Sequence, residues 1–278
     1  MQTSIAKTQD YREDRERVKQ IKLLVMEMSY KAHVGHIGSA ISIVDLLTVL
    51  YFHTLNISKA SLRSPDRDRF ILSKGHAAAA LYAVLYKKGI LPQKMLSTFA
   101  ADEEGLCEHP EIKDPGIEMT TGSLGHGLPF GAGIALGLKK NNSPGRVFIL
   151  VSDGECGEGS VWEAAIFASK HKLDNLTVIL ENNGWQCFGN VSDITNLAPF
   201  SPKWSSFGWG VVEIDGHNLT EIHTALDELP VIQGKPSIII AKTRAGKGVS
   251  LFENQLSAHC KMLTESEYRL ARNELENS

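Results

Sequence analysis

At 278 residues the chain is long enough to bury the core of one large domain or of two small ones. A hydrophobic content of 42%, a charged content of 22% and a formal net charge of −3 give no electrostatic reason to expect nucleic acid or a membrane surface as a partner. No apolar stretch reaches ~18 residues and the start of the chain is polar, so we expect neither a transmembrane span nor a signal peptide. The four scattered cysteines indicate reduced thiols in a cytoplasmic protein.

The elements predicted in chain order are helices and short apolar strands. Residues 1–10 have the character of a disordered segment, and from Tyr11 apolar positions recur at helical spacing, which predicts a surface helix up to a Gly-rich break at 33–39. A second helix is expected at 41–52, and an irregular region at 89–120. The other predicted elements are a strand at 69–72, an Ala-rich helix at 77–87, a helical segment after 127, strands at 147–151, 176–180, 209–214 and 236–243, and helices at 219–229 and 264–275.

This pattern indicates an α/β protein with a mostly parallel central sheet and helices on both faces. The runs at 147–151 and 176–180 are short, rich in β-branched residues and bounded by turn formers, as is typical of buried parallel strands. No repeat, low-complexity linker or composition break divides the sequence, so we expect a single domain, 1–278.

A polar motif follows each of these two strands. Residues 152–155 are Ser-Asp-Gly-Glu, and residues 181–183 are Glu-Asn-Asn. Ligands of open α/β sheets bind beyond the carboxyl ends of the strands, where both motifs fall. Asp153 offers a carboxylate, Gly154 allows close approach of a ligand, and Asn183 offers a neutral oxygen, a combination that suits a hard cation carrying phosphate groups. Either motif alone is equally compatible with an ordinary strand–turn–helix.

Four further segments have an ordinary structural explanation when taken singly. The histidines at 33–39 are compatible with a polar turn between helices. His76, beside Lys74 at a helix start, is compatible with an anion contact or with an inert cap. The Gly-rich turn at 121–127 is compatible with exposure of backbone groups to a ligand or with helix packing alone, and Gly131, Gly133 and Gly137 after it let a helix press closely on a neighbour. Exposure to solvent is an ordinary explanation of the basic loop at 242–248.

The order of these motifs resembles a known family. The pair formed by 152–155 and 181–183 is similar to the thiamine diphosphate signature, Gly-Asp-Gly followed after just under thirty residues by Asn-Asn. From about Val18 to Lys261 the chain resembles the N-terminal, diphosphate-binding half of transketolase, and best the split form in which that half is a separate polypeptide. The resemblance implies a single thiamine-diphosphate-binding domain.

The resemblance also implies the metal and cofactor contacts. Asp153, Asn183 and the main-chain carbonyl of Trp185 resemble the protein ligands of Mg²⁺ or Ca²⁺. Glu158 resembles a carboxylate that links two active sites across a dimer. The residues that resemble the cofactor-binding set are His76, Gly122, Ser123, Leu124, Gly154, Glu158, Asn183 and His259.

The reaction implied by the resemblance transfers a two-carbon ketol unit from a ketose to an aldose, with thiamine diphosphate as the electron sink. His36, Ser39, His109 and His259 resemble the residues that bind the donor sugar. We expect the catalytic histidines His36, His109 and His259 to move the hydroxyl protons, because the ordinary pKa of histidine lies near working pH.

The sequence departs from the family pattern at several positions. These are Ser152 for Gly, Ile37 for Pro, His126 for Gln, Glu181 for Asp, Ala245 for Lys and Cys260 for Gly. We expect no special role for the Ser152 side chain, and Arg244 and Lys247 are candidates to compensate for Ala245. None of the departures removes a metal ligand, so they bear on the donor substrate more than on the cofactor.

The family pattern also predicts a partner. The carboxylic acid that drives ionisation of the cofactor, and the groups that grip the sugar phosphate, belong in the family to a second, pyrimidine-binding domain. We therefore expect this chain to be inactive alone and to assemble with a separate pyrimidine-binding subunit, two of each chain. Small sugars or sugar phosphates are the expected substrates, and neither nucleic acid nor a membrane is an expected partner.

The sequence alone leaves other functions open. The departures at Ile37 and Ala245 are compatible with a thiamine diphosphate enzyme that uses another two-carbon donor or acceptor in a specialised pathway. A non-catalytic subunit of the same fold is disfavoured by intact Asp153 and Asn183, since a binding-only chain has no physical need of metal ligands. A nicotinamide-binding Rossmann domain is a remote alternative, because no Gly-x-Gly-x-x-Gly follows the first strand.

Overall fold

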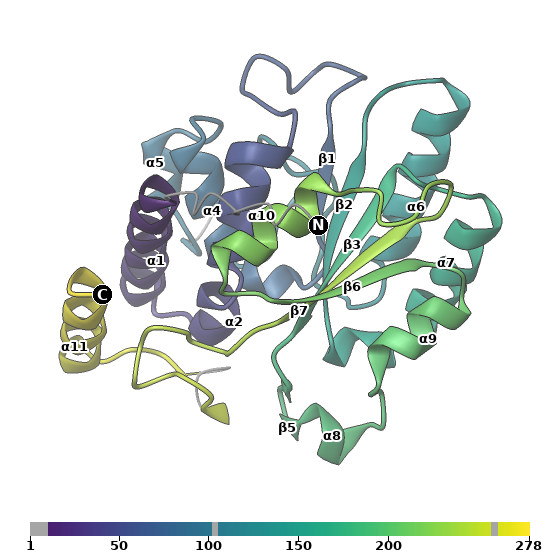
Figure 1. Cartoon of the computed structure of the whole chain (residues 1–278). Coiled ribbons are helices and arrows are strands. Elements are labelled where there is room, and N and C mark those ends of the chain that lie inside the picture. Colours follow the sequence, from purple (N-terminus) through teal and green to yellow (C-terminus); the bar gives the residue numbers. More distant parts are fainter. Residues whose placement is uncertain (1–10, 102–104, 257–260) are drawn as a thin grey trace, which may run out of the picture.

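A five-stranded parallel sheet forms the centre of the computed structural model, which describes residues 11–101, 105–256 and 261–278 (Figure 1). Its strand order is β1-β2-β3-β7-β6. The strands are β1 Arg69–Leu72, β2 Val147–Ser152, β3 Leu176–Asn182, β6 Gly210–Asp215 and β7 Ser237–Lys242. All five predicted strands are confirmed. The expectation for residues 1–10, and the positions of His259 and Cys260, lie outside the described residues.

Helices cover both faces of the sheet, as predicted (Figure 1). One face carries α1 Arg12–Ala32, α2 Ile37–Ile41, α3 Val44–Val49, α4 Ala78–Lys87 and α10 Leu219–Asp227, with α5 Gln93–Leu96 beside α4 and α11 Glu265–Glu276 packed on α1. The other face carries α6 Gly127–Lys140, α7 Gly159–Lys170 and α9 Phe200–Ser206. A hairpin of β4 Trp185–Gln186 and β5 Gly189–Asn190 leads to α8 Val191–Ile194. No helix of the described ranges is long and apolar enough to cross a membrane.

The side chains of β2 show how the sheet separates two cores. Phe148 and Leu150 belong to the larger core, with α1 to α4. Val147, Ile149 and Val151 point to the opposite face and belong to the smaller core, with α6, α7 and α9. Because successive side chains of a strand alternate between faces and both faces are covered, the whole strand is buried. This is why the sequence shows a continuous apolar run there.

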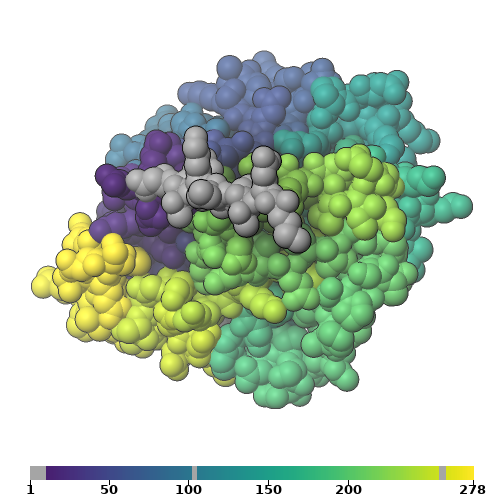
Figure 2. Space-filling model, in the orientation of Figure 1, coloured from purple at the N-terminus to yellow at the C-terminus, as the bar shows by residue number. Residues whose placement is uncertain are grey.

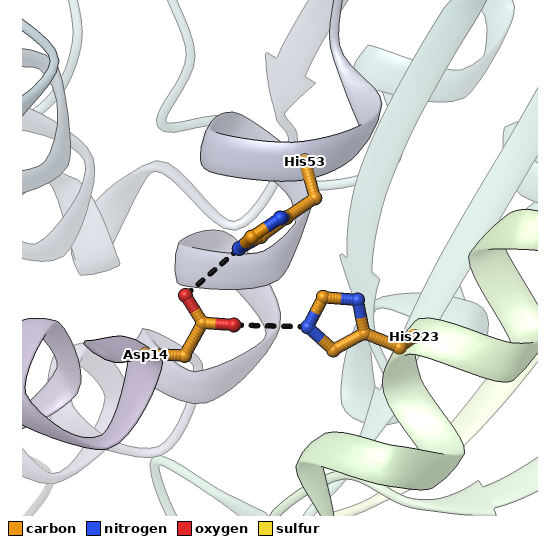
Figure 3. A group of neighbouring side chains, drawn as sticks. All are labelled: Asp14, His53 and His223. Carbon is orange, nitrogen blue, oxygen red and sulfur yellow. Dashed lines mark hydrogen bonds and ion pairs between the residues drawn. The ribbon is translucent and has the colours of Figure 1, made fainter. Parts of the chain in front are cut away.

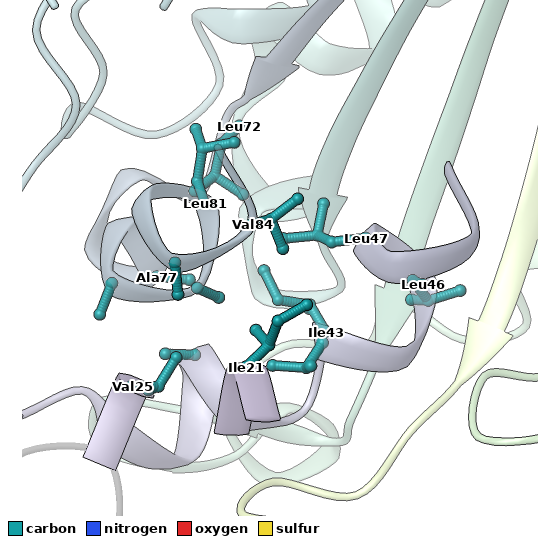
Figure 4. Close-up of a cluster of buried hydrophobic side chains, with 14 of the residues drawn as sticks. Ile21, Val25, Ile43, Leu46, Leu47, Leu72, Ala77, Leu81 and Val84 are labelled. Atoms are coloured by element: carbon teal, nitrogen blue, oxygen red, sulfur yellow. The ribbon is translucent and has the colours of Figure 1, made fainter. Parts of the chain in front are cut away.

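The larger core fixes the helices that carry the loops of the sheet edge (Figure 4). Ile21 and Val25 of α1, Ile43, and Leu81 and Val84 of α4 all lie within one fully buried cluster. Each such side chain contributes roughly 1.5–3 kcal/mol by leaving water. The loops between these helices are therefore held on a rigid base.

The prediction of one helix at 41–52 is wrong. The chain forms α2 and α3 with a break between them, and a π-helix, η1 Leu50–Thr54, continues from α3. At the break the Ser42 hydroxyl donates to the Ser39 carbonyl at 3.0 Å and to Glu181 Oε1 at 2.5 Å. A side chain that bonds to nearby carbonyls competes with the helical pattern, and here it also reaches the end of β3.

Glycine in α6 permits close packing at only one of the three expected positions. A Cβ atom on Gly131 would lie 2.3 Å from Ile149 Cδ1, so this glycine lets the helix press on β2. The same atom on Gly133 or Gly137 would meet nothing within 4 Å among the described residues. Those two positions face outward, and the packing explanation for them is wrong. The sequence pattern also gave no boundaries for α7, and α9 was not predicted.

Candidate active site

The ends of β2 and β3 bring Asp153 and Asn183 to one edge of the sheet. The two strands are parallel neighbours, so the motifs that follow them emerge side by side. Asp153 Oδ2 accepts a 2.7 Å hydrogen bond from the Gly184 N–H, which ties the first motif to the second. The Asn183 side-chain oxygen accepts a 2.8 Å hydrogen bond from the Trp185 N–H, which fixes the amide beside the same turn.

Asp153 is a buried carboxylate that takes part in none of the ion pairs of the described chain. Its pKa is raised to about 7, first by burial and then by the negative charge of Glu181. The N–H groups of Gly184 and Gly154 donate to it and oppose the shift. A divalent cation at this carboxylate would stabilise the ionised form, so the electrostatics fit a metal ligand.

Glu181, the neighbouring carboxylate, is neutralised by the protein itself. Its Oε2 lies 2.6 Å from Lys74 Nζ, and both side chains are fully buried. Burial raises the pKa of Glu181, but the charge and hydrogen bond of Lys74, with bonds from Ser42 and Asn183, outweigh burial and leave the pKa lowered. Lys74 Nζ also donates to the Ser39 carbonyl at 3.1 Å. The pair therefore joins the end of β3 to α2, the helix that directly follows His36.

Glu155 organises the Gly-rich loop and was not predicted. Its Oε1 accepts from the Ser73 hydroxyl and from the Gly125 N–H at 2.8 Å, and its Oε2 accepts from the Ser152 N–H at 3.2 Å. The Ser152 hydroxyl in turn accepts from the Glu155 N–H at 3.2 Å, so the expectation that this side chain has no role is wrong. An acidic residue directly after the Asp-Gly pair was the available signal.

Three of the predicted cofactor-binding and donor-binding residues, His36, Ser39 and His76, lie together. His76 Nε2 lies 3.2 Å from Ser39 Oγ, and the rings of His36 and His76 have centroids 5.2 Å apart. His36 precedes α2 with a left-handed backbone (φ 60°). His76 lies in a 3₁₀ turn, Gly75–Ala77, before α4. Two loops from distant parts of the sequence thus present imidazoles to the same space.

His109 lies against the Gly-rich loop instead. A Cβ atom on Gly122 would lie 3.2 Å from His109 Cδ2, so the ring packs beside this exposed glycine. The Tyr82 hydroxyl donates to the His109 carbonyl at 3.2 Å and fixes the segment. The structure therefore brings His109 beside Gly122, one of the predicted cofactor contacts, and His259 lies outside the described residues.

Glu158 and Ser123 lie on the surface beside that loop. Glu158 precedes α7 and is exposed, as are Gly122 and Ser123. A Cβ atom on Gly125 would lie 2.5 Å from Glu158 Cβ, so the loop packs directly on this residue. Exposure of a carboxylate at this position is compatible with a contact across an interface between protomers. Its role stays a prediction.

Gln186 is a second residue that sequence reasoning missed. A Cβ atom on Gly154 would lie 3.2 Å from Gln186 Cβ and 3.3 Å from its Oε1, so the side chain lies across the Asp153 turn. The Gln186 Nε2 atom is buried and has no hydrogen-bond partner among the described residues. A buried amide donor left without an acceptor is costly, and an anionic oxygen of a ligand would satisfy it.

The basic loop at 242–248 contacts α2 through a backbone hydrogen bond. The Gly246 N–H donates to the Gly38 carbonyl at 3.0 Å. Ala245 is buried, while Arg244 and Lys247 pair with Glu253 at 2.9 and 3.4 Å. Both candidate substitutes for the missing lysine are thus engaged by one carboxylate.

Two further departures have clear structural positions. Ile37 is fully buried in the larger core at the start of α2, where packing takes the place of the rigidity that Pro would give. His126 is exposed and precedes α6.

These residues fit a diphosphate held by a metal ion. The donor set is one buried carboxylate, one amide oxygen and the main-chain carbonyls of the following turn, which are oxygens that Mg²⁺ and Ca²⁺ accept. A buried amide donor without a partner among the described residues lies beside them. Fold and site thus define an α/β protein whose ligand binds at the carboxyl edge of a parallel sheet.

Comparison with known proteins gives the family. Residues 13–277 match the family model described as transketolase, thiamine diphosphate binding domain. The chain is 41% identical over 257 residues to the 6-deoxy-6-sulfo-D-fructose transketolase subunit SqwG of Clostridium sp. (strain MSTE9), covering 92% of this chain and 94% of that one. It is 40% identical over 259 residues to an apulose-4-phosphate transketolase subunit of Actinobacillus succinogenes, with 92% of each chain covered.

Solved transketolase structures share the fold but are longer. The transketolase of Campylobacter jejuni superposes with a TM-score of 0.90 and 30% identity, covering 96% of this chain and 43% of that chain. The chain belongs to the transketolase family, as its thiamine diphosphate-binding domain. It matches the separate-subunit members along nearly their whole length, which confirms the predicted split type and the class of transketolase-type transferase.

Proposed function

We propose that this chain is the diphosphate-binding subunit of a thiamine diphosphate-dependent transketolase that moves a two-carbon ketol unit from a ketose, or ketose phosphate, to an aldose. The observation that carries the proposal is the tie between Asp153 and the turn after Asn183, which puts a buried carboxylate and an amide at one strand edge. Bound thiamine diphosphate would supply the electron sink for breaking the bond between ketose carbons 2 and 3.

Asp153, Asn183 and the main-chain carbonyl of Trp185 would hold Mg²⁺ or Ca²⁺ on the diphosphate. Gly154 leaves room for the diphosphate beside the turn, and Gln186 Nε2 would donate to one of its oxygens. The remaining proposed cofactor contacts are His76, Gly122, Ser123, Leu124, Glu158 and His259.

The histidines of this chain would bind the sugar and move its protons. His36, directly before α2, and Ser39, within α2 and bonded through its carbonyl to Lys74, would hold donor hydroxyl groups from one side. His109 would approach from the side of the Gly-rich loop. Neutral imidazole accepts a proton from a hydroxyl and imidazolium returns it, so these groups suit each addition and cleavage step.

We further propose that activity requires a separate pyrimidine-binding subunit, in an assembly of two of each chain. Two proteins that this chain matches nearly end to end are named as transketolase subunits, and the chain covers only 43% of the Campylobacter jejuni transketolase chain. The scattered cysteines support a cytoplasmic location for the assembly.

The names of the relatives bear on the proposed substrate class. The relatives named for 6-deoxy-6-sulfo-D-fructose and for apulose 4-phosphate match at 41% and 40% identity, so neither is favoured by similarity alone. Their names support the second candidate, a specialised two-carbon transferase whose donor or acceptor is not a common sugar phosphate. Ala245, in place of a lysine, is the sequence feature that agrees with this candidate.

The test is reconstitution with the pyrimidine-binding chain that co-purifies with this one. The pair, with thiamine diphosphate and Mg²⁺, is assayed with xylulose 5-phosphate, fructose 6-phosphate, 6-deoxy-6-sulfo-D-fructose and apulose 4-phosphate as ketoses. Ketol transfer by the pair, and none by either chain alone, is expected. Turnover by this chain alone would contradict the partner requirement, and cofactor binding without any transfer would favour a non-catalytic role.

A further inference from the structure

A carboxylate and two imidazoles meet on the α10 side of the sheet, in a cluster that the proposed reaction does not use (Figure 3). Asp14 lies in the first turn of α1, His53 in the π-helix η1, and His223 in α10. His53 Nε2 lies 2.8 Å from Asp14 Oδ1, and His223 Nε2 lies 2.9 Å from Asp14 Oδ2. Three segments far apart in the sequence thus aim their polar atoms at a common point.

The burial of the three side chains differs in a way that suits a site with one open side. Asp14 and His223 are buried, at 2% and 8% exposure. The His53 side chain keeps 39% of its surface exposed. The cluster is therefore open to solvent on the side of His53, while Asp14 and His223 lie inside the fold.

The rings are held by their neighbours. The Tyr11 ring stacks on His223 with centroids 4.4 Å apart and an interplanar angle of 13°. The His53 and His223 rings meet edge to face at 4.6 Å. Because packing fixes both planes, the two Nε2 lone pairs or protons keep their direction toward Asp14, and little freedom is lost when a ligand binds.

We propose that Asp14, His53 and His223 form a binding site for a divalent metal ion of the Zn²⁺ class. The three ligand atoms lie within 4.8 Å of one another. Ligand atoms around a tetrahedral ion with bonds of about 2.0–2.2 Å lie roughly 3.3–3.6 Å apart, so the Nε2–oxygen distances of 2.8 and 2.9 Å must lengthen by about half an ångström to admit the ion. Two imidazole nitrogens and one carboxylate oxygen leave a further position for water. This site is separate from the strand-end site, whose donors are all oxygens.

The surrounding charges select the kind of ion. Arg17 Nη1 lies 3.0 Å from Asp14 Oδ1, and the same guanidinium also pairs with Glu13. A positively charged side chain beside the carboxylate weakens the binding of ions such as Mg²⁺ or Ca²⁺, whose affinity depends mainly on charge. Ions that prefer nitrogen ligands gain more from the two imidazoles, so Zn²⁺, Ni²⁺ and Cu²⁺ are favoured over them.

Metal binding at this cluster exchanges hydrogen bonds for coordination bonds. In the present arrangement both Nε2 atoms face carboxylate oxygens. Each ring coordinates a metal through its Nε2 lone pair, so a proton on Nε2 must move to Nδ1 or to water when the metal binds. Metal–ligand bonds would then take the place of the two hydrogen bonds that now link α1 to η1 and to α10.

The experiment uses the full chain without a polyhistidine tag and ZnCl₂ as the only added probe. Competition with a chromophoric chelator measures stoichiometry and affinity, and Co²⁺ in place of Zn²⁺ reports coordination by its visible absorption. One Zn²⁺ per chain with micromolar or tighter affinity is expected, with a midpoint of thermal unfolding raised by roughly 5 °C at hundredfold excess over Kd.

Glutamine variants separate metal ligation from hydrogen bonding. His53→Gln and His223→Gln keep a donor for Asp14 but remove the imidazole, and each should weaken Zn²⁺ binding by roughly a hundredfold. His171→Gln, at an exposed histidine after α7, is the matched control and should bind as the parent chain does.

Two results would overturn the proposal: Zn²⁺ that does not bind stoichiometrically, or Zn²⁺ that binds equally well to His53→Gln. Should His223→Gln fail to fold, the exposed His53 variant decides. Cofactor binding is measured on the same samples, so a failure of the proposed transketolase function is seen separately.

Discussion

The carboxylates at the ends of β2 and β3 are both buried, yet the protein treats their charges differently. Glu181 has Lys74 at 2.6 Å and accepts from two hydroxyl groups, so its charge is balanced within the fold. Among the described residues Asp153 has only backbone N–H donors, and its pKa is raised to about 7. The difference separates a carboxylate that holds the structure together from one that the fold keeps for a bound cation.

The largest effect is expected from removing the internal cation. Lys74→Met leaves Glu181 buried and unpaired, which should lower the free energy of unfolding by about 3–5 kcal/mol. Denaturant unfolding measures it. Lys139→Met, which breaks the exposed pair with Asp174, is the control and should cost less than about 1 kcal/mol. Equal losses in the two variants would contradict a structural role for the buried pair.

Asp153→Asn should act on function instead. We expect the reconstituted pair to lose roughly a hundredfold or more in ketol transfer, since one metal ligand loses its charge. The unfolding free energy should change less than in Lys74→Met, because the loss of a buried charge offsets the loss of one acceptor for a backbone N–H. If the variant kept full activity at limiting Mg²⁺, the role of Asp153 as the carboxylate that binds the cation would be contradicted.

The pH dependence of Mg²⁺ affinity and of stability gives a further test of the difference between Asp153 and Glu181. Mg²⁺ binds the ionised carboxylate, so affinity should fall roughly tenfold per pH unit below the pKa of Asp153 of about 7 and level off above it. The stability of the metal-free chain should change with pH in the opposite direction to the Mg²⁺ affinity. The folded pKa lies above the ordinary 3.8, so this residue's contribution to stability is present below about pH 4 and is lost as pH rises toward 7. Calorimetric titration between pH 5.5 and 8 checks the first part, and urea unfolding of the metal-free chain checks the second.

The smallest effect is expected at Gln186. Replacing it with Leu removes a buried donor that has no acceptor among the described residues, so the metal-free chain should be as stable as the parent. Thiamine diphosphate affinity should fall by roughly tenfold, the value of one hydrogen bond to a charged oxygen. Unchanged affinity would mean that this amide does not face the diphosphate.

The strands β2, β3 and β7 were predictable from the sequence because they are buried on both faces. Burial of both faces accounts for the continuous apolar run of β2. The predicted helix at 219–229 forms α10, and Asn218 directly before it is the cap, because its side chain accepts from the N–H groups of Thr220 and Glu221. The helix at 41–52 was wrong because its break depends on a hydroxyl that reaches Glu181, a contact between residues far apart in the sequence.

Contacts between residues far apart in the sequence also limited what could be predicted of the candidate active site. Asp153 and Asn183 were visible because each belongs to a motif at the end of a strand. Glu155 was missed because its role depends on the Gly-rich loop that folds against it, and Gln186 was missed because its role depends on how the β4–β5 hairpin that carries it folds over Gly154. Periodicity along the chain holds no information about such contacts.

The most direct test of the central claim is calorimetric titration of thiamine diphosphate into the reconstituted pair with and without Mg²⁺. We expect tight binding only with the metal, and loss of this metal dependence together with most of the affinity in Asp153→Asn. Equal affinity with and without Mg²⁺, or an unchanged titration in the variant, would contradict the account.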